Sequence, residues 1–399
     1  MKILVVSQYF YPEEFKVNEM VEEFVKLGHE VTVLSGKPNY PKGEFFKGYK
    51  FFGVQHEDYK GAKVIRVPLI KRGKGGAIRL AMNYFSFVFF GQLYVRMHKI
   101  EADKIICYEP SPITMAYPAI LARRKTKAPF SFWVQDLWPE SVAAASNLKN
   151  PFIFKMLDKM VRDIYKNCDH IFVQSPGFID SIVEKGVDKN IISVAYNWAE
   201  DTYIHIIPNK EKYLDIIPKG FVVMFAGNVG ESQDLDNIIK AAELTKDYPD
   251  IKWVIVGDGR KKADAEKQVK GKNMDDRFLF LGRYHVEEMP HFFVHADAML
   301  VSLKDEYIFS LTIPAKTQSY MCCGKPIVTM VSGEANKIIK EANCGFTANS
   351  GNYKTLAENV VKMYKSDKNK LNEMGENGKK YYYEHFAKQI VIDDILATM

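Results

Sequence analysis

The feature that most constrains the fold is an alternation of short apolar runs with amphipathic helical segments, which repeats along the whole chain. The runs are rich in β-branched residues and almost continuously apolar, a pattern typical of parallel strands that are covered on both faces. Between them lie segments such as VNEMVEEFVKLG, where Val17, Met20, Val21, Phe24 and Val25 fall on one face of a helix. The alternation predicts doubly wound α/β sheets.

The alternation also predicts where the chain divides. We expect strands at KILVVSQ, HEVTVLS, KVIRVP, KIICYE, FSFWVQD, HIFVQS and IISVAYN, and then at FVVMFAGN, KWVIVGDG, RFLFLGR, AMLVSL and PIVTMVS. A polar, irregular stretch near residues 197–218 separates the two sets, and 399 residues exceed the size at which a single core keeps growing. We therefore predict two Rossmann-like domains, residues 1–197 and 198–378, with the ligand site in the cleft between them, at the carboxyl ends of the strands.

Composition excludes several classes of protein. With 47% apolar and 26% charged residues the chain is of the ordinary soluble globular type, and a net charge of +6 is too weak to indicate nucleic-acid binding. The five cysteines include no C-x-x-C pair, which favours reduced thiols in the cytoplasm over a disulfide framework or a zinc site. No apolar run of about 18 residues and no signal peptide is apparent, so neither a spanning helix nor export is expected.

Glycines follow two strands of the second half. In FAGNVGESQDLDNIIKAAE, Gly227 and Gly230 would let a ligand approach the backbone at a helix start, although a tight strand-to-helix turn is the alternative. Gly257, Gly259 and Arg260 repeat the arrangement in IVGDGR. Neither a Walker motif nor a G-x-G-x-x-G after the first strand is present, so these strand ends fit a diphosphate that is held without a metal.

The segment SLTIPAKTQSYMCCGKPIV places a lysine at a helix start. Thr312 is suited to cap the helix and Pro314 to its first turn, so Lys316 would lie at the positive end of the helix dipole. A cation is unfavourable there unless an anion occupies the site, which predicts a phosphate cradle. The alternative is a lysine that extends to solvent.

These segments, with WVIVGDGR, FLFLGRY, ADAMLVSL and SGEANKIIKEANCG, resemble in order and spacing the C-terminal half of the retaining family-4 glycosyltransferases of GT-B fold. The N-terminal half resembles the same family through YFYPEEFKVNEMVEEFVKLGHEVTVLSGKPNYPKGEFFKGY and WVQDLWPES. The resemblance covers essentially the whole chain and is greatest to the O-antigen and capsule branch, which includes N-acetyl-L-fucosaminyltransferases. It implies two facing Rossmann-like domains and a last helix, residues 379–399, that packs back on the N-terminal domain.

The resemblance implies a UDP-sugar donor on the C-terminal domain. Gly227 and Asn228 would face the diphosphate or the sugar, and Arg260 and Lys316 would neutralise the leaving diphosphate. The resemblance further implies the donor contacts that follow: Gly282 and Arg283 against the base, and Gly333 and Glu334 near the sugar and phosphates.

The chain departs from the family at one pair of residues. Many members carry two glutamates separated by seven residues, where this sequence has Leu311 and Ser319. Gln318, Ser319 or Glu334 would then replace the usual ribose contact, or the chain binds a nucleotide without turning it over.

On the acceptor side, Asp136 follows a buried strand in WVQDLWPES. The family often has His-Asp where this chain has Gln135-Asp136. The carboxylate would orient or deprotonate the acceptor hydroxyl, and a helix N-cap is the equal alternative. Lys16 and Asn18 of the first loop are expected to point into the cleft.

A basic and aromatic segment, residues 69–99, suits the surface of an anionic membrane, with an ordinary buried helix as the alternative. Its membrane-contact candidates are Lys71, Arg72, Lys74, Arg79, Phe85 and Phe89.

Together these readings predict a metal-independent, retaining glycosyltransferase of the hexosyltransferase type that needs no cofactor and is peripheral at the cytoplasmic face of the membrane. It would move an (N-acetyl)amino sugar, with N-acetyl-L-fucosamine as one candidate, from a UDP-sugar to a polyprenyl-diphosphate-linked saccharide of O-antigen or capsule. His291 and His295 lie four apart but lack a third ligand, so no metal site is predicted. Two alternatives stay open: a non-catalytic UDP-sugar-binding partner, and a UDP-sugar 2-epimerase of GT-B fold.

Overall fold

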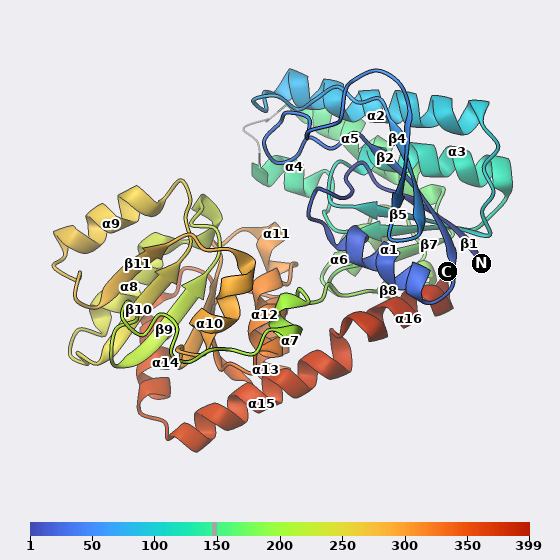
Figure 1. Ribbon diagram of the computed structural model, residues 1–399. Coiled ribbons are helices and arrows are strands. Elements are labelled where there is room, and N and C mark those ends of the chain that lie inside the picture. Colours follow the sequence, from blue (N-terminus) through green and yellow to red (C-terminus); the bar gives the residue numbers. More distant parts are fainter. Residues whose placement is uncertain (146–149) are drawn as a thin grey trace. The chain divides into compact units, whose positions relative to one another are not determined.

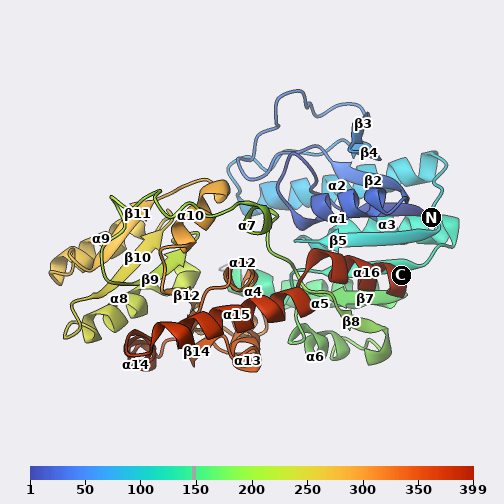
Figure 2. The ribbon, with the colours of Figure 1, turned by 60° about the horizontal axis from the view of Figure 1, so that its bottom comes forward.

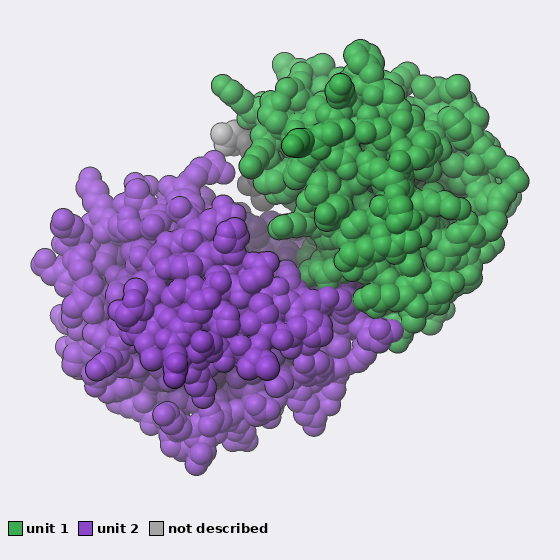
Figure 3. All heavy atoms as spheres, viewed as in Figure 1, with its two compact units in different colours: residues 1–195, 391–399 green, residues 196–390 purple. Residues whose placement is uncertain are grey.

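The computed structural model describes residues 1–145 and 150–399. It divides into two compact units, one made of residues 1–195 and 391–399 and the other of residues 196–390 (Figure 3). Each unit has its own sheet of almost entirely parallel strands with helices packed on it (Figures 1 and 2). The predicted fold class, two doubly wound Rossmann-like α/β domains, is confirmed.

In the described part of the first unit the strands form one sheet in the order β3-β4-β2-β1-β5-β6-β7-β8. Only β3 is antiparallel to its neighbour, and β3 is also the strand of this sheet that the sequence pattern did not predict. The strands are β1 (Lys2–Val6), β2 (Glu30–Gly36), β3 (Gln55–Tyr59), β4 (Ala62–Val67), β5 (Lys104–Glu109), β6 (Phe130–Val134), β7 (His170–Val173) and β8 (Ile192–Val194). The helices are α1 (Lys16–Lys26), α2 (Ala77–Met97), α3 (Ala116–Thr126), α4 (Glu140–Ala145), α5 (Pro151–Lys166) and α6 (Phe178–Val183).

In the second unit the described strands are all parallel and run in the order β11-β10-β9-β12-β13-β14. They are β9 (Phe221–Ala226), β10 (Ile251–Val256), β11 (Phe278–Gly282), β12 (Ala298–Ser302), β13 (Ile327–Met330) and β14 (Gly345–Ala348). The helices are α7 (Thr202–His205), α8 (Leu235–Leu244), α9 (Lys262–Gly271), α10 (Met289–Phe293), α11 (Tyr307–Ser310), α12 (Ala315–Cys322), α13 (Glu334–Glu341), α14 (Tyr353–Tyr364) and α15 (Lys368–His385).

The core of the second unit explains why its strands read as continuous apolar runs. Every residue of β9 is buried, because alternate side chains enter different clusters on the two faces of the sheet. Phe221, Val223 and Phe225 pack with α8 and α14. The alternate residues Val222, Met224 and Ala226 pack with α10, α12 and α13. Because helices cover both faces of the sheet, the loops that follow its strands lie together at its carboxyl edge.

The C-terminal segment, which we expected as one helix over residues 379–399, is two helices. α15 ends at His385 within the second unit, and α16 (Lys388–Thr398) follows it. Residues 391–399 belong to the first unit, where the ammonium of Lys104 donates a hydrogen bond to the carbonyl of Met399.

Candidate functional site

The carboxyl edge of the second sheet carries the predicted glycine loops. Gly227, Gly257 and Gly282 follow or end the neighbouring strands β9, β10 and β11. Gly227 and Gly257 line a pocket of about 320 Å³, and Gly282 immediately precedes Arg283, which also lines it. The residues that line it are Gly227, Asn228, Val256, Gly257, Asp258, Arg283, Tyr284 and Met289. The structure therefore brings Gly227 and Asn228 together with Arg283, which lies far from them in the sequence.

The loops after β9 and β10 pack backbone against backbone, and this needs glycine. A Cβ atom at Gly257 would lie 1.8 Å from the carbonyl oxygen of Gly227, and one at Gly259 would lie 2.3 Å from that of Val229. Backbone hydrogen bonds hold the contact: the N–H of Gly227 donates to the carbonyl of Val256 at 2.9 Å. The glycines of the two motifs thus allow the loops after β9 and β10 to pack closely together. Gly227 and Gly257 of these loops line the pocket.

Replacing Gly257 by alanine is expected to destabilise the second unit by about 1–3 kcal/mol, because the new methyl group must displace backbone atoms. Gly271→Ala is the matched control: nothing lies within 4 Å of a Cβ atom there, so its melting temperature should stay the same or rise slightly. Thermal unfolding followed by circular dichroism compares the two variants. Equal stability of Gly257→Ala and the wild type would contradict the close packing of the loops.

Lys316 lies in the first turn of α12, close to Gly227. Its ammonium nitrogen is 2.7 Å from Oε1 of Gln233 and 3.6 Å from the centre of the Phe225 ring. A Cβ atom on Gly227 would be 3.7 Å from the same nitrogen. Burial lowers the pKa of Lys316 to about 7, and no carboxylate among the described residues forms an ion pair with it. The predicted lysine is therefore a partly buried amine whose charge no anion of its own chain balances.

The neighbours of Lys316 fix α12 against β9. The hydroxyl of Tyr320 accepts a hydrogen bond from the N–H of Ala226 at 3.0 Å and is 3.2 Å from the carbonyl oxygen of the same residue. Gln318 is fully buried, and its amide nitrogen donates to the carbonyls of Pro314 and Ala315. This corrects the expectation for Gln318, since its side chain satisfies the helix start instead of a ligand.

Ser319 likewise bonds within the protein. Its hydroxyl lies 3.3 Å from the carbonyl oxygen of Ala315 and 3.5 Å from Oε2 of Glu200. The side chain is buried, and its part in the missing ribose contact stays a prediction.

Gly333 and Glu334 lie at the start of α13. Gly333 has φ +79°, and a Cβ atom on it would be 1.9 Å from the carbonyl oxygen of Ser310, in the segment that leads to α12. Glu334 is buried, and its carboxylate pairs with Lys337 at 2.5 Å. Of the three suggested replacements for the ribose contact, Glu334 alone carries a carboxylate, and it lies on α13 instead of α12.

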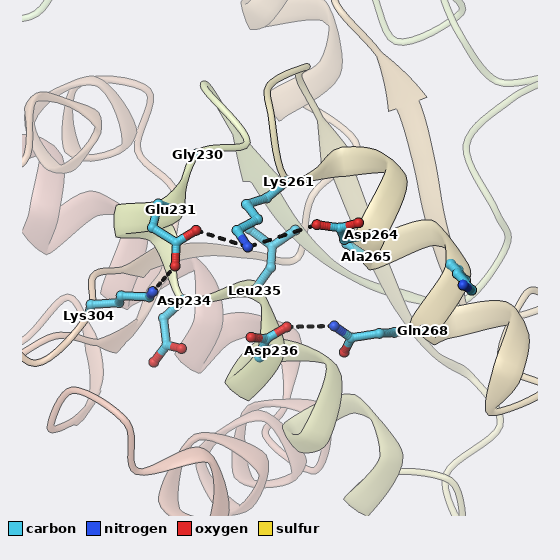
Figure 4. Close-up of a pocket in the computed structure, with 11 residues that line it drawn as sticks. Gly230, Glu231, Asp234, Leu235, Asp236, Lys261, Asp264, Ala265, Gln268 and Lys304 are labelled. Carbon is cyan, nitrogen blue, oxygen red and sulfur yellow. Dashed lines mark hydrogen bonds and ion pairs between the residues drawn. The ribbon is translucent and has the colours of Figure 1, made fainter.

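A second pocket, of about 460 Å³, is lined by charged side chains from the start of α8, from α9 and from the loop after β12 (Figure 4). Figure 4 shows Glu231 between two lysines: it pairs with Lys261 at 3.0 Å and also with Lys304. The two cations are therefore balanced by a carboxylate of the chain. Arg260, which we expected to neutralise the diphosphate, is exposed and lines neither this pocket nor the one beside Gly227.

In the first unit Asp136 lies just past the carboxyl end of β6, beside a second carboxyl group that the sequence analysis missed. Glu109 ends the neighbouring strand β5 and is fully buried, and its Oε1 accepts the N–H of Ser111 at 2.9 Å. The backbone N–H of Gln135 donates to the Glu109 carbonyl at 3.1 Å. The sequence does show a glutamate at the end of an otherwise apolar run. Its importance is visible only once β5 pairs with β6, which brings Glu109 beside Asp136.

Burial raises the pKa of both carboxyl groups. Burial raises the pKa of Asp136 to about 6, and the nearby hydroxyl groups of Ser141 and Ser111 act in the opposite direction. The pKa of Glu109 is well above its usual range, first because of burial and then because of the charge on Asp136. At neutral pH an ionised Asp136 therefore lies beside a carboxyl group, Glu109, in which burial favours the protonated form. Asp136 is not the N-cap of α4, which begins at Glu140.

The two expected acceptor-side residues of the first loop have structural partners. Asn18 accepts the N–H of Tyr11 at 2.9 Å and donates to the carbonyl of Glu13 at 2.7 Å, so it fixes the loop, which corrects its expected role. Lys16 pairs with Glu19 at 3.3 Å within α1.

The membrane-contact candidates divide into two groups. Phe85 and Phe89 are 58% and 62% exposed on α2, and Lys74 is exposed in the loop before it. In contrast, Lys71 pairs with Glu44, and Nε of Arg79 donates to the carbonyl of Lys71 at 2.9 Å. Arg72 turns toward tyrosines in its own unit. The basic cluster is therefore largely engaged by the protein, which corrects the expectation for Arg72 and Arg79.

No group of three or more His, Cys, Asp or Glu side chains in residues 1–145 and 150–399 is arranged to hold a metal ion. No helix in the same residues is both long and apolar enough to cross a membrane.

Known protein families match both halves of the chain. The model for glycosyl transferases group 1 matches residues 207–381, and the model for the glycosyl transferase 4-like domain matches residues 14–198. WcaI of Escherichia coli (strain K12), provisionally described as a colanic acid biosynthesis glycosyl transferase, is 26% identical over 70% of this chain and 71% of its own length. WbjE of Pseudomonas aeruginosa, provisionally described as a glycosyltransferase, is 25% identical over 87% of this chain and 84% of its own.

Solved structures share the fold. HepE of Anabaena, crystallised with UDP, has a TM-score of 0.68 at 14% identity, over 100% of this chain and 99% of its own. WaaG, a glycosyltransferase involved in lipopolysaccharide biosynthesis, has a TM-score of 0.64 at 14% identity, over 100% and 98% of the two chains.

Proposed function

Since the family models and the fold identify the chain as a group 1 glycosyltransferase of the GT-B fold, we propose that it transfers a sugar from a UDP-sugar to a polyprenyl-diphosphate-linked saccharide. The description of WcaI and the role of WaaG support polysaccharide or lipopolysaccharide synthesis as the setting. HepE, whose structures contain UDP and UDP-glucose, supports UDP as the nucleotide. As finer proposals we retain transfer with retention, an (N-acetyl)amino sugar such as N-acetyl-L-fucosamine, and an O-antigen or capsule product.

The observation that carries the proposal is the partly buried ammonium of Lys316 beside Gly227. When a glycosyl group leaves its donor, the bond between the anomeric carbon and the diphosphate breaks and negative charge grows on the phosphate oxygens. An amine fixed by Gln233 and by the Phe225 ring lies ready to neutralise that charge. The amides at the start of α12 and the glycine edge of the pocket add further donors.

On the acceptor side we assign Asp136 to orient the attacking hydroxyl and to share its proton. With a pKa of about 6 it is ionised at neutral pH and remains a strong enough base to take part. In retaining transfer by front-face attack the proton ends on the leaving phosphate, so Asp136 accepts the hydroxyl proton during the attack and Lys316 stabilises the phosphate that finally receives it. We propose no cofactor and no metal requirement.

The test is UDP release from a panel of UDP-sugars, measured with and without a detergent-solubilised polyprenyl-diphosphate saccharide and with and without a chelator. We expect one amino-sugar donor to release UDP only when the acceptor is present, and chelation to leave the rate unchanged. NMR of the product gives the configuration of the new bond. UDP binding without release would favour the non-catalytic partner, and sugar conversion without an acceptor would favour the epimerase.

We propose further that α2 contacts an anionic membrane surface at the cytoplasmic face. Its exposed apolar side chains follow helical spacing along one side and are Ile78, Met82, Phe85, Phe89, Leu93 and Met97. Phe52, 84% exposed, extends this face, because the rings of Phe51 and Phe90 pack edge to face at 5.9 Å and join the loop to the helix. Exposed lysines in the same loops, among them Lys50 and Lys74, supply positive charge.

The double variant Phe85→Ser/Phe89→Ser is expected to reduce co-sedimentation with phosphatidylglycerol vesicles by about tenfold. The variant lacks two exposed aromatic side chains that would insert into the bilayer. Phe152→Ser is the control, since Phe152 is 75% exposed in the same unit but lies on α5. Turnover of a short-chain, water-soluble acceptor should be unchanged in both variants. Equal vesicle binding by the double variant and the wild type would refute this membrane contact.

A further inference from the structure

Arg72 lies in a cluster of tyrosines in the first unit. Its Nη1 donates to the hydroxyl of Tyr9 at 2.6 Å, and its guanidinium carbon is 5.9, 5.2 and 6.0 Å from the ring centres of Tyr9, Tyr40 and Tyr84. Tyr9 is buried, whereas Tyr40 is 38% exposed. The guanidinium is thus held by aromatic faces and a hydroxyl, and the cluster reaches the surface at Tyr40.

Buried hydrogen bonds fix the loops that carry this cluster. The N–H of Arg72 donates to Oδ1 of Asn39 at 2.9 Å, and Asn39 is fully buried. Oε1 of Glu13 accepts the N–H groups of both Asn39 and Tyr40, each at 2.7 Å. The position of the guanidinium is therefore set by the chain itself before any ligand binds.

A second arginine in the same unit shows what is unusual about Arg72. Arg66 is also surrounded by rings, 5.4 Å from that of Phe10 and 5.7 Å from that of Tyr49, but its Nε pairs with Glu57 at 3.1 Å. No carboxylate among the described residues forms such a pair with Arg72. Arg66 is a neutralised structural arginine, whereas Arg72 has no ion-pair partner among the described residues.

The cluster borders the acceptor carboxylate and the apolar face of α2. Burial raises the pKa of Tyr84, the charge of Arg72 lowers it and the charge of Asp136 raises it, so both charged groups lie near the hydroxyl of Tyr84. α2 begins at Ala77, a few residues beyond Arg72, and its first exposed apolar side chain is Ile78, which is 80% exposed. An anion on Arg72 would therefore lie near the group that orients the acceptor, with an apolar surface beginning close by.

We propose that Arg72 binds a phosphate of the acceptor, the diphosphate that joins its saccharide to its prenyl chain. This rests on the proposed function. A guanidinium matches phosphate oxygens through paired N–H donors, and a site already shielded by rings strengthens such a contact. Tyrosine hydroxyls supply further donors to the same oxygens. A prenyl chain attached to that phosphate can extend along the exposed apolar side of α2.

The test measures binding of geranyl diphosphate, without a donor, by isothermal titration calorimetry. Arg72→Ala is expected to weaken binding by about tenfold or more, and Arg72→Lys by less, because lysine keeps the charge but loses the paired donors. Arg124→Ala is the matched control: this exposed arginine of the same unit bonds only to Asn167 among the described residues. If Arg72→Ala does not fold, as judged by thermal unfolding, Arg72→Lys and Arg72→Gln decide. Unchanged affinity in the folded variants would overturn the proposal.

Two further readouts identify the source of the phosphate. With the full acceptor, Arg72→Ala should raise KM and change kcat little, while co-sedimentation with phosphatidylglycerol vesicles should stay as in the wild type. A loss of vesicle binding with unchanged geranyl diphosphate affinity would overturn the proposal in favour of a lipid headgroup. If no sugar transfer is found but geranyl diphosphate binding depends on Arg72, the proposed function fails and this assignment stands.

Discussion

Lys316→Met is expected to weaken UDP binding at pH 7 by roughly 30-fold or more, because a charged hydrogen bond to phosphate is worth roughly 2–3 kcal/mol. Methionine keeps the length and apolar contacts of the side chain, so the packing on the Phe225 ring should persist. Lys252→Met is the control, since Lys252 is a lysine of the same unit whose ammonium bonds to the carbonyl of Asp276 at 3.0 Å. Calorimetric titration with UDP compares the three proteins.

The pH dependence gives this prediction a second readout. With a pKa of about 7, Lys316 is largely neutral above pH 7 in the free protein. The diphosphate favours the charged amine, so binding above pH 7 must take up a proton and UDP affinity must fall as the pH rises. Below a pH of about 6 the terminal phosphate of UDP itself becomes protonated, which limits the gain on the acid side. Proton uptake, seen as a dependence of the binding enthalpy on the buffer, should vanish in Lys316→Met. Unchanged affinity and uptake in this variant would remove the amine from the donor site.

The fold was largely predictable because its strands are buried on both faces. Parallel strands in that position read as continuous apolar runs, and β9, with every residue buried, is the clearest case. The two strands that were missed lack this signal. β3, Gln55–Tyr59, is polar throughout and pairs antiparallel with β4 at the end of the sheet. β14, Gly345–Ala348, is short and begins with glycine at the opposite end of the other sheet.

Candidate site residues could be predicted where a local sequence pattern fixes their place at the end of a strand or the start of a helix. Glycines after strands, and a lysine after a proline at a helix start, led to Gly227 and Lys316, which the structure places together. Glu109 and Arg72 escaped because their significance depends on neighbours distant in the sequence: Asp136 for the first and the tyrosines for the second. The basic residues around Arg72 led us to predict that it contacts a membrane surface. In the structure its side chain instead donates a hydrogen bond to Tyr9. Local sequence identifies a charged residue but not the direction of its side chain.

Asp136→Asn is expected to reduce turnover by about 100-fold or more if the carboxylate takes part in proton transfer, with little change in UDP affinity. In the wild type the rate should fall as the pH drops through about 6, because protonation of Asp136 removes the base. The variant should lose this acid limb. A rate close to that of the wild type would mean that the leaving phosphate alone takes the proton.

Stability separates this role from a structural one. Because burial raises the pKa of Asp136 above its unfolded value, the folded state favours the protonated form, and the ionised form costs stability increasingly as the pH rises from about 4 to about 6. Asparagine carries no charge, so at pH 7 the melting temperature of Asp136→Asn should equal or exceed that of the wild type. Asp169→Asn should do the reverse: its pKa is lowered, first by the hydrogen bond from Arg123, so this variant should melt earlier at pH 7 and keep its turnover. Lost activity in a protein that is no less stable is the result that a purely structural Asp136 does not produce.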